Sequence, residues 1–387
     1  MIKSVTVKVI DHKNSYIRPP RTVEIETEHG KFMTPTRAAT RHEYLQKAKL
    51  PTVSPIDNAF SSNVITLEKN DFSKFMTDNT YFETILRKVQ NKAVVERYST
   101  FLFEFYLTSS GKSPSLPIVQ DPNVREGFLK RIIDIHRRKS IQNLIIPYLN
   151  IPLSDYIQEL NQLKVACDKF NLTMIPQVDL TYKQFKPLLD HCIKNLNLNA
   201  ISLIYRAYDK TAQSYQAVWG YNEQDVAFFV SHIPRSLSTM EDLSGVHYMP
   251  FSVGDIFALI EYPPHHFPKQ NDTDLAKLKF FDRKDCDLKS IKQLLPVFNT
   301  FKDTIKKEID SDNSLDNVID NIQEAGSNVE KYNVVKALTL THELKASTLE
   351  FTVLRSNIKS QDSVEYVRSK PKLKPIVNKS LRLNNYF

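Results

Sequence analysis

The chain has 387 residues, 41% of them hydrophobic, which is enough for one large domain with a small addition. Its net charge of +8 favours a polyanionic partner such as nucleic acid, while its seven scattered glycines exclude a phosphate-binding loop or a dinucleotide fingerprint. Its three isolated cysteines exclude a disulfide framework. The sequence has neither a signal-like apolar start nor a run of ~18 apolar residues, so we expect a cytoplasmic protein that makes no membrane contact.

Residues 1–110 are expected to mix β-structure with helices. Apolar residues alternate with polar ones over residues 5–9 and 22–27, which predicts a β-hairpin ahead of the main domain. One further strand is expected among residues 51–66, and a loop at 69–79. Apolar and aromatic residues at helical spacing predict three helices, at 42–48, 81–89 and 93–107.

From residue 114 onward, strand-like apolar runs alternate with amphipathic helical segments such as 154–170 and 182–195. This alternation predicts a parallel sheet covered by helices, and about eight units predict closure into a (β/α)8 TIM barrel of the α/β class. A short apolar helix is expected at 256–260. The predicted strands are 116–119, 144–149, 174–178, 200–204, 226–230, 246–251 and 278–281.

The barrel pattern fades after residue 295. Residues 299–332 are polar and acidic, so we expect a solvated helical or partly disordered insert there, followed by a long helix at 333–359. The expected domains are a TIM-barrel catalytic-type domain at 1–298, a C-terminal helical appendage at 299–368, and a basic flexible tail at 369–387.

Two aspartates follow predicted strands. Asp282 comes directly after the run 278–281, which places it at the C-terminal end of a strand, where parallel barrels carry their chemistry. Taken alone, such an aspartate is more often a helix cap or a loop residue. Asp121 follows the run 116–119 and precedes Pro122, which is also typical of a turn.

Several segments together match one family, in one order. Residues 25–35 contain Gly-x-Phe-x-Thr-Pro, residues 117–121 end in an aspartate, and residues 147–152 carry Asn-Ile-Pro. Residues 175–189 and 246–259 follow, then Phe280-Phe281-Asp282, and finally residues 341–367. In this order the segments resemble those of the archaeal-type tRNA-guanine transglycosylases.

The resemblance implies a barrel enzyme that exchanges a base in nucleic acid through a covalent sugar–aspartate intermediate. It puts Asp282 on the family's nucleophile and Asp121 on a catalytic aspartate that acts as general acid or base. Asn150 and Gln177 fall on residues that bind the base, with Asn150 in place of an aspartate. Since an amide lacks two negative oxygens, the base preference is expected to differ. The alternative is that Asn150 and Gln177 only satisfy loop backbone groups.

The family's zinc site, three cysteines and one histidine, is reduced to Cys286 and His342. Two ligands do not make such a site, so the resemblance implies neither a metal nor a cofactor here, and His342 is expected to be a buried or interface histidine. The lost cysteines and motif glycines favour a rival interpretation. In it the chain is a non-catalytic homologue that binds nucleic acid or a catalytic partner, as a homodimer or heterodimer.

The last eight residues, 380–387 (SLRLNNYF), follow a basic, proline-containing linker. Leu383, Tyr386 and Phe387 resemble a sliding-clamp binding peptide, which puts one aliphatic and two aromatic side chains into a groove of the clamp. The alternative is a tail that folds back onto its own barrel. A clamp partner would favour DNA over tRNA as the substrate.

Overall fold

The computed structural model describes residues 1–13, 18–47, 49–50, 60–89, 100–108, 116–207, 211–236, 245–260, 275–309, 316–320, 322 and 329–374. Their centre is a parallel nine-stranded sheet in the order β4-β12-β11-β10-β9-β8-β7-β6-β5. Its two end strands, β4 (Thr36–Arg37) and β5 (Ala39–Thr40), are separated only by Ala38, so the sheet closes on itself. With β4 and β5 counted as one strand, the barrel has eight strands, and the predicted (β/α)8 barrel is confirmed.

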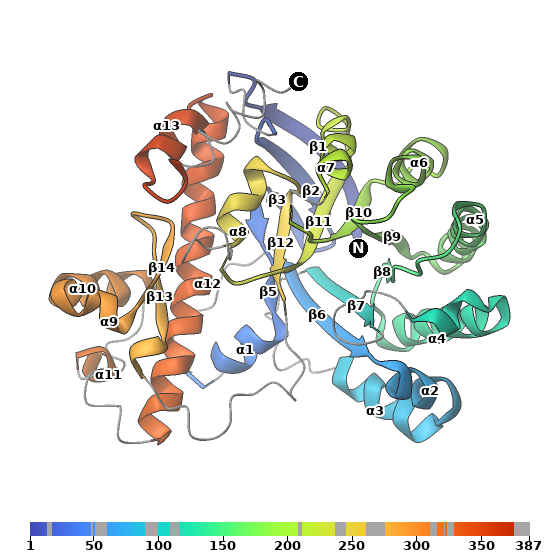
Figure 1. Cartoon of the computed structure of the whole chain (residues 1–387), viewed down its shortest axis with the longest axis horizontal. Coiled ribbons are helices and arrows are strands. Elements are labelled where there is room, and N and C mark those ends of the chain that lie inside the picture. The colour runs from blue at the N-terminus through green and yellow to red at the C-terminus, as the bar shows by residue number, and fades with distance from the viewer. Residues whose placement is uncertain are drawn as a thin grey trace.

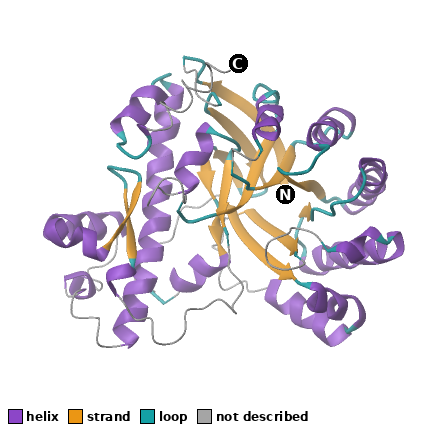
Figure 2. Ribbon diagram, in the orientation of Figure 1, coloured by secondary structure: helices purple, strands orange, loops and turns teal. Residues whose placement is uncertain are grey.

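The other barrel strands follow in chain order around the barrel, with helices on the outside (Figure 1, Figure 2). These strands are β6 (Phe60–Leu67), β7 (Thr100–Leu107), β8 (Asn143–Ile146), β9 (Thr173–Asp179), β10 (Ala200–Ile204), β11 (Ala227–Ile233) and β12 (Ile256–Leu259). The outer helices include α1 (Arg41–Lys47), α2 (Lys69–Thr77), α3 (Asn79–Val89), α4 (Pro122–Lys139), α5 (Leu153–Phe170), α6 (Phe185–Asp190) and α7 (Ala212–Trp219). The predictions at 42–48, 81–89, 154–170, 174–178 and 200–204 are thus confirmed within a few residues.

An antiparallel sheet of β1 (Ile2–Ile10), β2 (Arg21–Thr27) and β3 (Gly30–Met33) covers the amino end of the barrel, as the alternating pattern predicted. The Ile2 amide donates to Oδ1 of Asn143, the first residue of β8, at 3.0 Å. Apolar side chains of this sheet pack with those of the barrel interior. The amino end is therefore closed, which leaves the carboxyl end of the barrel for a ligand.

The C-terminal part is helical, with one hairpin. The hairpin strands β13 (Lys279–Asp282) and β14 (Asp287–Ser290) pair antiparallel. The long helix α12 (Val329–Lys359) packs against α1, β4 and β13. The remaining C-terminal helices are α9 (Ile291–Leu294), α10 (Phe298–Ile309), α11 (Asp316–Asp320) and α13 (Ser363–Ser369). Among the helices that the structure describes, none combines the length and apolar character that a bilayer span requires.

Several predictions of element type are wrong. Residues 100–107 form strand β7, although a helix was predicted at 93–107; the first residues of that prediction lie outside the described part of the chain. Residues 256–259 form strand β12 and not a helix. Residues 69–77 form helix α2 and not a loop. Pro117–Gln120 is a 3-10 turn, and the segment 246–251 is helical, in α8 (Gly245–Tyr248) and a 3-10 turn (Met249–Phe251). Short apolar runs have no distinctive period, so their type depends on what surrounds them.

The predicted strand at 278–281 exists as β13, but it is not a barrel strand. β13 pairs only with β14 among the described strands, whereas β12 lies between β11 and β4 and completes the barrel. This difference matters for function because Asp282 ends the first strand of the hairpin and does not follow the eighth barrel strand.

His247 gives a stability prediction. Its ring stacks on the rings of Phe281 and Phe351, with ring centroids 4.5 and 4.8 Å apart. Neither ring nitrogen has a hydrogen-bond partner among the described residues. Burial, with the nearby Arg37 charge second, holds the pKa of His247 well below its usual value, so the folded protein holds a neutral ring.

We expect His247→Phe to stabilise the fold by about 1–2 kcal/mol, because it removes two buried unpaired polar atoms. The gain should grow below about pH 6.5, where the unfolded chain of the parent protein takes up a proton that its folded form does not. Urea unfolding at pH 8 and pH 5.5 measures both effects. His136→Phe is the matched control and should destabilise, because Nδ1 of His136 lies 3.2 Å from the Ile141 carbonyl oxygen.

Candidate functional site

The side chains inside the barrel change from apolar to polar along its axis. Successive inward-facing residues of one strand are two apart. On β7, Leu102 belongs to the interior apolar cluster and Glu104 follows it; on β9, Ile175 is followed by Gln177. The same change occurs on β10 from Ala200 to Ser202 and on β11 from Phe229 to Ser231. All of these side chains are buried, so the carboxyl half of the interior is a polar core.

Three side chains from alternate strands meet in this polar core: Glu104 of β7, Gln177 of β9 and His232 of β11. We call them the interior cluster. Gln177 Nε2 donates to Glu104 Oε2 at 2.5 Å, and His232 Nε2 lies 3.2 Å from Glu104 Oε1. Their exposed fractions are only 1%, 1% and 7%. A carboxylate, an amide and an imidazole are thus in contact within the buried core of the barrel.

His232 reaches the interior because the backbone departs from regular strand geometry there. Its φ is 61°, in the left-handed region that non-glycine residues seldom adopt, and the β11–β12 register shifts between Val230 and Ile233. Ser231 and His232 can therefore both face inward. The Tyr106 ring packs against the His232 ring with centroids 4.2 Å apart. Backbone strain of this kind is concentrated at functional sites.

Several polar atoms in this core have no hydrogen-bond partner among the residues that the structure describes. Buried polar atoms are usually paired, so a group of unpaired ones favours a position where a small polar molecule binds. The atoms are the hydroxyls of Ser62, Ser202 and Ser231, together with Glu104 Oε1 and His232 Nε2, which face only each other.

An ion pair and a tyrosine border the cluster. Arg206, which follows β10, places Nη2 2.6 Å from Oδ2 of Asp179, the last residue of β9. Burial lowers the pKa of Arg206, but the Asp179 carboxylate outweighs it and raises that pKa overall. The Tyr148 hydroxyl donates to Asn150 Oδ1 at 2.9 Å, and burial raises the pKa of this phenol above its usual value, so it remains a donor.

The two predicted base-binding residues are linked through Tyr148. Gln177 belongs to the interior cluster, and its Oε1 accepts from the Tyr148 amide at 3.4 Å. Asn150 is an exposed residue in the mostly buried loop after β8, and it accepts from the hydroxyl of the same tyrosine. Gln177 is therefore positioned to contact a ligand inside the barrel, while Asn150 lies at its edge.

The two predicted catalytic aspartates are engaged elsewhere. Asp121 caps helix α4, accepting from the amides of Asn123 at 2.9 Å and Val124 at 3.5 Å. Asp282 ends β13, where Lys289 Nζ lies 2.6 Å from its Oδ2. Figure 1 shows α4 and the β13–β14 hairpin on opposite sides of the barrel. No described contact brings the two carboxylates together, so their pairing as catalytic residues stays a prediction from the resemblance.

The capping role of Asp121 is testable. We expect Asp121→Ala to lower the free energy of unfolding by about 1 kcal/mol, because two amides at the start of α4 lose their acceptor. Asp121→Asn should lose little, since its side-chain oxygen still accepts. Chemical denaturation of the two variants measures the difference, and equal losses would contradict the capping role.

In the segment that the resemblance assigns to a zinc site, His342 and Cys286 each lie close to one polar side chain. His342 is fully buried, as expected, with Nε2 3.0 Å from Glu308 Oε2. Cys286 Sγ lies 3.6 Å from the Tyr366 hydroxyl, and burial raises the pKa of this thiol to about 12. The described residues contain no group of three or more His, Cys, Asp or Glu that could hold a metal ion.

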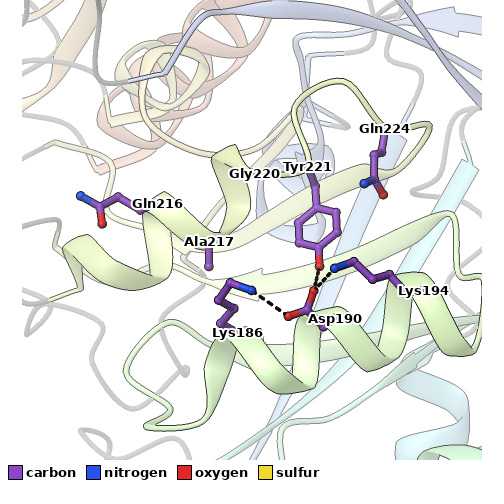
Figure 3. Close-up of a pocket in the computed structure, with 8 residues that line it drawn as sticks. All are labelled: Lys186, Asp190, Lys194, Gln216, Ala217, Gly220, Tyr221 and Gln224. Atoms are coloured by element: carbon purple, nitrogen blue, oxygen red, sulfur yellow. Dashed lines mark hydrogen bonds and ion pairs between the residues drawn. The ribbon is translucent and has the colours of Figure 1, made fainter.

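A small surface pocket lies between α6 and α7, on the outer ring (Figure 3). Lys186 and Lys194 point toward Asp190, at 3.0 and 2.6 Å, and the Tyr221 hydroxyl donates to the same carboxylate. Burial raises the Asp190 pKa, but the hydrogen bonds from Lys194, Tyr221 and Lys186 outweigh it and lower that pKa overall. Its carboxylate is thus already paired, which favours a structural role for these residues.

Sequence reasoning missed Glu104 and His232. Glu104 lies within the run predicted as a helix at 93–107, although a single glutamate inside the apolar run FLFEFYL is a signal for a buried functional carboxylate. No local pattern indicates that His232 faces inward. The predicted clamp-binding residues Leu383, Tyr386 and Phe387 lie outside the described part of the chain.

Comparison with known proteins does not identify a family for this chain, so its function has to be inferred from the site. The chain matches no protein-family model and no curated protein.

Proposed function

We propose that the carboxyl end of this barrel binds a base of a nucleic acid and exchanges it for another base, the reaction that the resemblance to tRNA-guanine transglycosylases implies. The observation that carries the proposal is the interior cluster, in which Glu104, Gln177 and His232 meet in a polar core with unpaired atoms. Carboxylate, amide and imidazole groups can bind the hydrogen-bonding edge of a base that has left its stack.

Charge supports a polyanionic partner. The net charge of +8 favours binding to tRNA or DNA, whose phosphates supply a large share of the affinity for basic proteins. The tail residues Leu383, Tyr386 and Phe387, if they bind a sliding clamp, favour DNA. The class of reaction is the one predicted from the resemblance, but the residues proposed to bind the nucleic-acid base lie inside the barrel.

Incorporation of labelled guanine into tRNA or into duplex DNA tests the proposal. We expect incorporation with one of the two polymers, and a loss of about 10²-fold or more in Glu104→Gln and Gln177→Ala, which alter the interior cluster. Asp282→Asn decides whether catalysis depends on Glu104 or on the predicted pair Asp121 and Asp282. Retained incorporation in Asp282→Asn supports the interior cluster, whereas loss in that variant together with full activity of Glu104→Gln would restore the paired aspartates.

A non-catalytic nucleic-acid-binding homologue is the second candidate. It is favoured by the engagement of Asp121 and Asp282 in a helix cap and an ion pair. This function predicts no incorporation with either polymer, together with binding of nucleic acid that weakens steeply as salt is raised. A filter-binding titration at two salt concentrations, run beside the incorporation assay, separates the two functions.

A further inference from the structure

Glu104 and His232 have the geometry of an oriented acid–base pair. We propose that Glu104 is a positioning residue that holds His232 in one tautomer, and that His232 is the catalytic residue that moves the proton during base exchange. The arrangement of the pair stands on geometry alone, whereas the reaction that it serves rests on the proposed function.

Two hydrogen bonds and one close polar contact link the Tyr148 amide, Gln177, Glu104 and His232. The Tyr148 amide can only donate, so the Gln177 side-chain oxygen faces it and the Gln177 nitrogen must face Glu104. Glu104 Oε2 is thus an acceptor. Glu104 Oε1 then faces His232 Nε2 at 3.2 Å and also needs a donor.

We place the His232 proton on Nε2, because Glu104 Oε1 is the acceptor that lies close to that nitrogen. In a neutral imidazole, this leaves the lone pair on Nδ1 free to accept a proton from a ligand. A histidine oriented by a carboxylate through its other nitrogen is a common arrangement for general acid–base catalysis. Asp179 and Arg206, on the neighbouring strand ends, pair with each other at 2.6 Å.

Base exchange needs this proton transfer in both directions. The incoming base loses the proton of its ring N–H as that nitrogen bonds to the anomeric carbon, and the outgoing base gains a proton on the nitrogen that leaves the same carbon. His232 first takes up a proton from solvent on Nδ1, gives that proton to the outgoing base as its bond to the anomeric carbon breaks, and regains one from the incoming base as the new bond forms. No proton is gained or lost overall, and no other reactant is needed.

The tautomer can be measured without any substrate. In protein labelled with ¹⁵N-histidine, we expect the ring nitrogen shifts of His232 to report a proton on Nε2. Glu104→Gln should move that proton to Nδ1, because the new amide must turn its oxygen to Gln177 and its NH2 group to His232. His136 is the internal control, since its Nδ1 faces the Ile141 carbonyl oxygen and should carry the proton in both proteins. A proton on Nδ1 of His232 in the parent protein, or no change in the variant, would overturn the pair.

The catalytic role has a separate readout. His232→Ala should lower base exchange by about 10²–10⁴-fold, and added imidazole should restore part of it. Loss without rescue, or no loss, overturns the role of His232 in proton transfer. If the parent protein exchanges no base in either polymer while the tautomer change is observed, the oriented pair stands and the proposed function fails.

Discussion

Asp255→Ala is expected to destabilise the protein by about 3–5 kcal/mol, because it leaves two buried guanidinium groups without their counter-ion. Asp255 is 1% exposed, and its carboxylate lies 2.8 Å from Arg21 Nη2 and 3.3 Å from Arg18 Nη2. It also accepts from the Phe228 amide at 2.9 Å. The loss should be measured as a lower urea midpoint at neutral pH.

Glu24→Gln is the matched control for this prediction. Glu24 pairs with Lys8 and Lys31 at the protein surface, where solvent screens the charges. Its urea midpoint should stay close to that of the parent protein. Equal losses in the two variants would show that the buried network around Asp255 has no special role in stability.

The contribution of Asp255 should also depend on pH. Burial raises its pKa, but Arg21 and Arg18 outweigh this, so the pKa of the folded carboxyl lies below its usual value. The unfolded chain then takes up a proton first as pH falls. The stabilisation is fully present above about pH 4–5 and decreases as pH falls from the unfolded pKa toward the folded one. The difference in stability between the parent protein and Asp255→Asn should narrow over that acidic range.

Gly254→Ala is expected to destabilise the protein by about 2–5 kcal/mol. Gly254 has a φ of +97°, which strains any residue with a Cβ, and a Cβ there would lie 2.2 Å from Val230 Cγ2. Relief would require the Val230 side chain to move, and Val230 lies on β11, the strand that also carries His232. Thermal unfolding of the variant should show a clearly lower midpoint.

Gly220→Ala is the matched control for the glycine prediction. Gly220 follows helix α7 with a φ of −58°, and the nearest atom to an added Cβ is 3.4 Å away, which is ordinary contact. Its stability should change by less than about 1 kcal/mol. A similar loss at both glycines would mean that Gly254 is not strained by its backbone.

The general fold could be predicted because its signals are local. Amphipathic segments such as 154–170 and apolar runs such as 174–178 and 200–204 carry their own period, and their alternation indicates a parallel barrel. The short run 256–260 and the aromatic run before Leu107 were predicted as helices, because strands buried on both faces lose the alternation that identifies them.

The amino-acid sequence alone determined the class of fold, the β-structure ahead of the barrel and the inclusion of Gln177 in the candidate site. Only the tertiary structure decided that β12, held beside Asp255 and its arginines, completes the barrel, and that β13 and Asp282 lie outside it. It also decided which acidic residue faces the interior, since Glu104 and His232 are 128 positions apart in the chain and 3.2 Å apart in space. Local periodicity records which face of an element is buried, but contacts between distant strands depend on closure of the whole barrel.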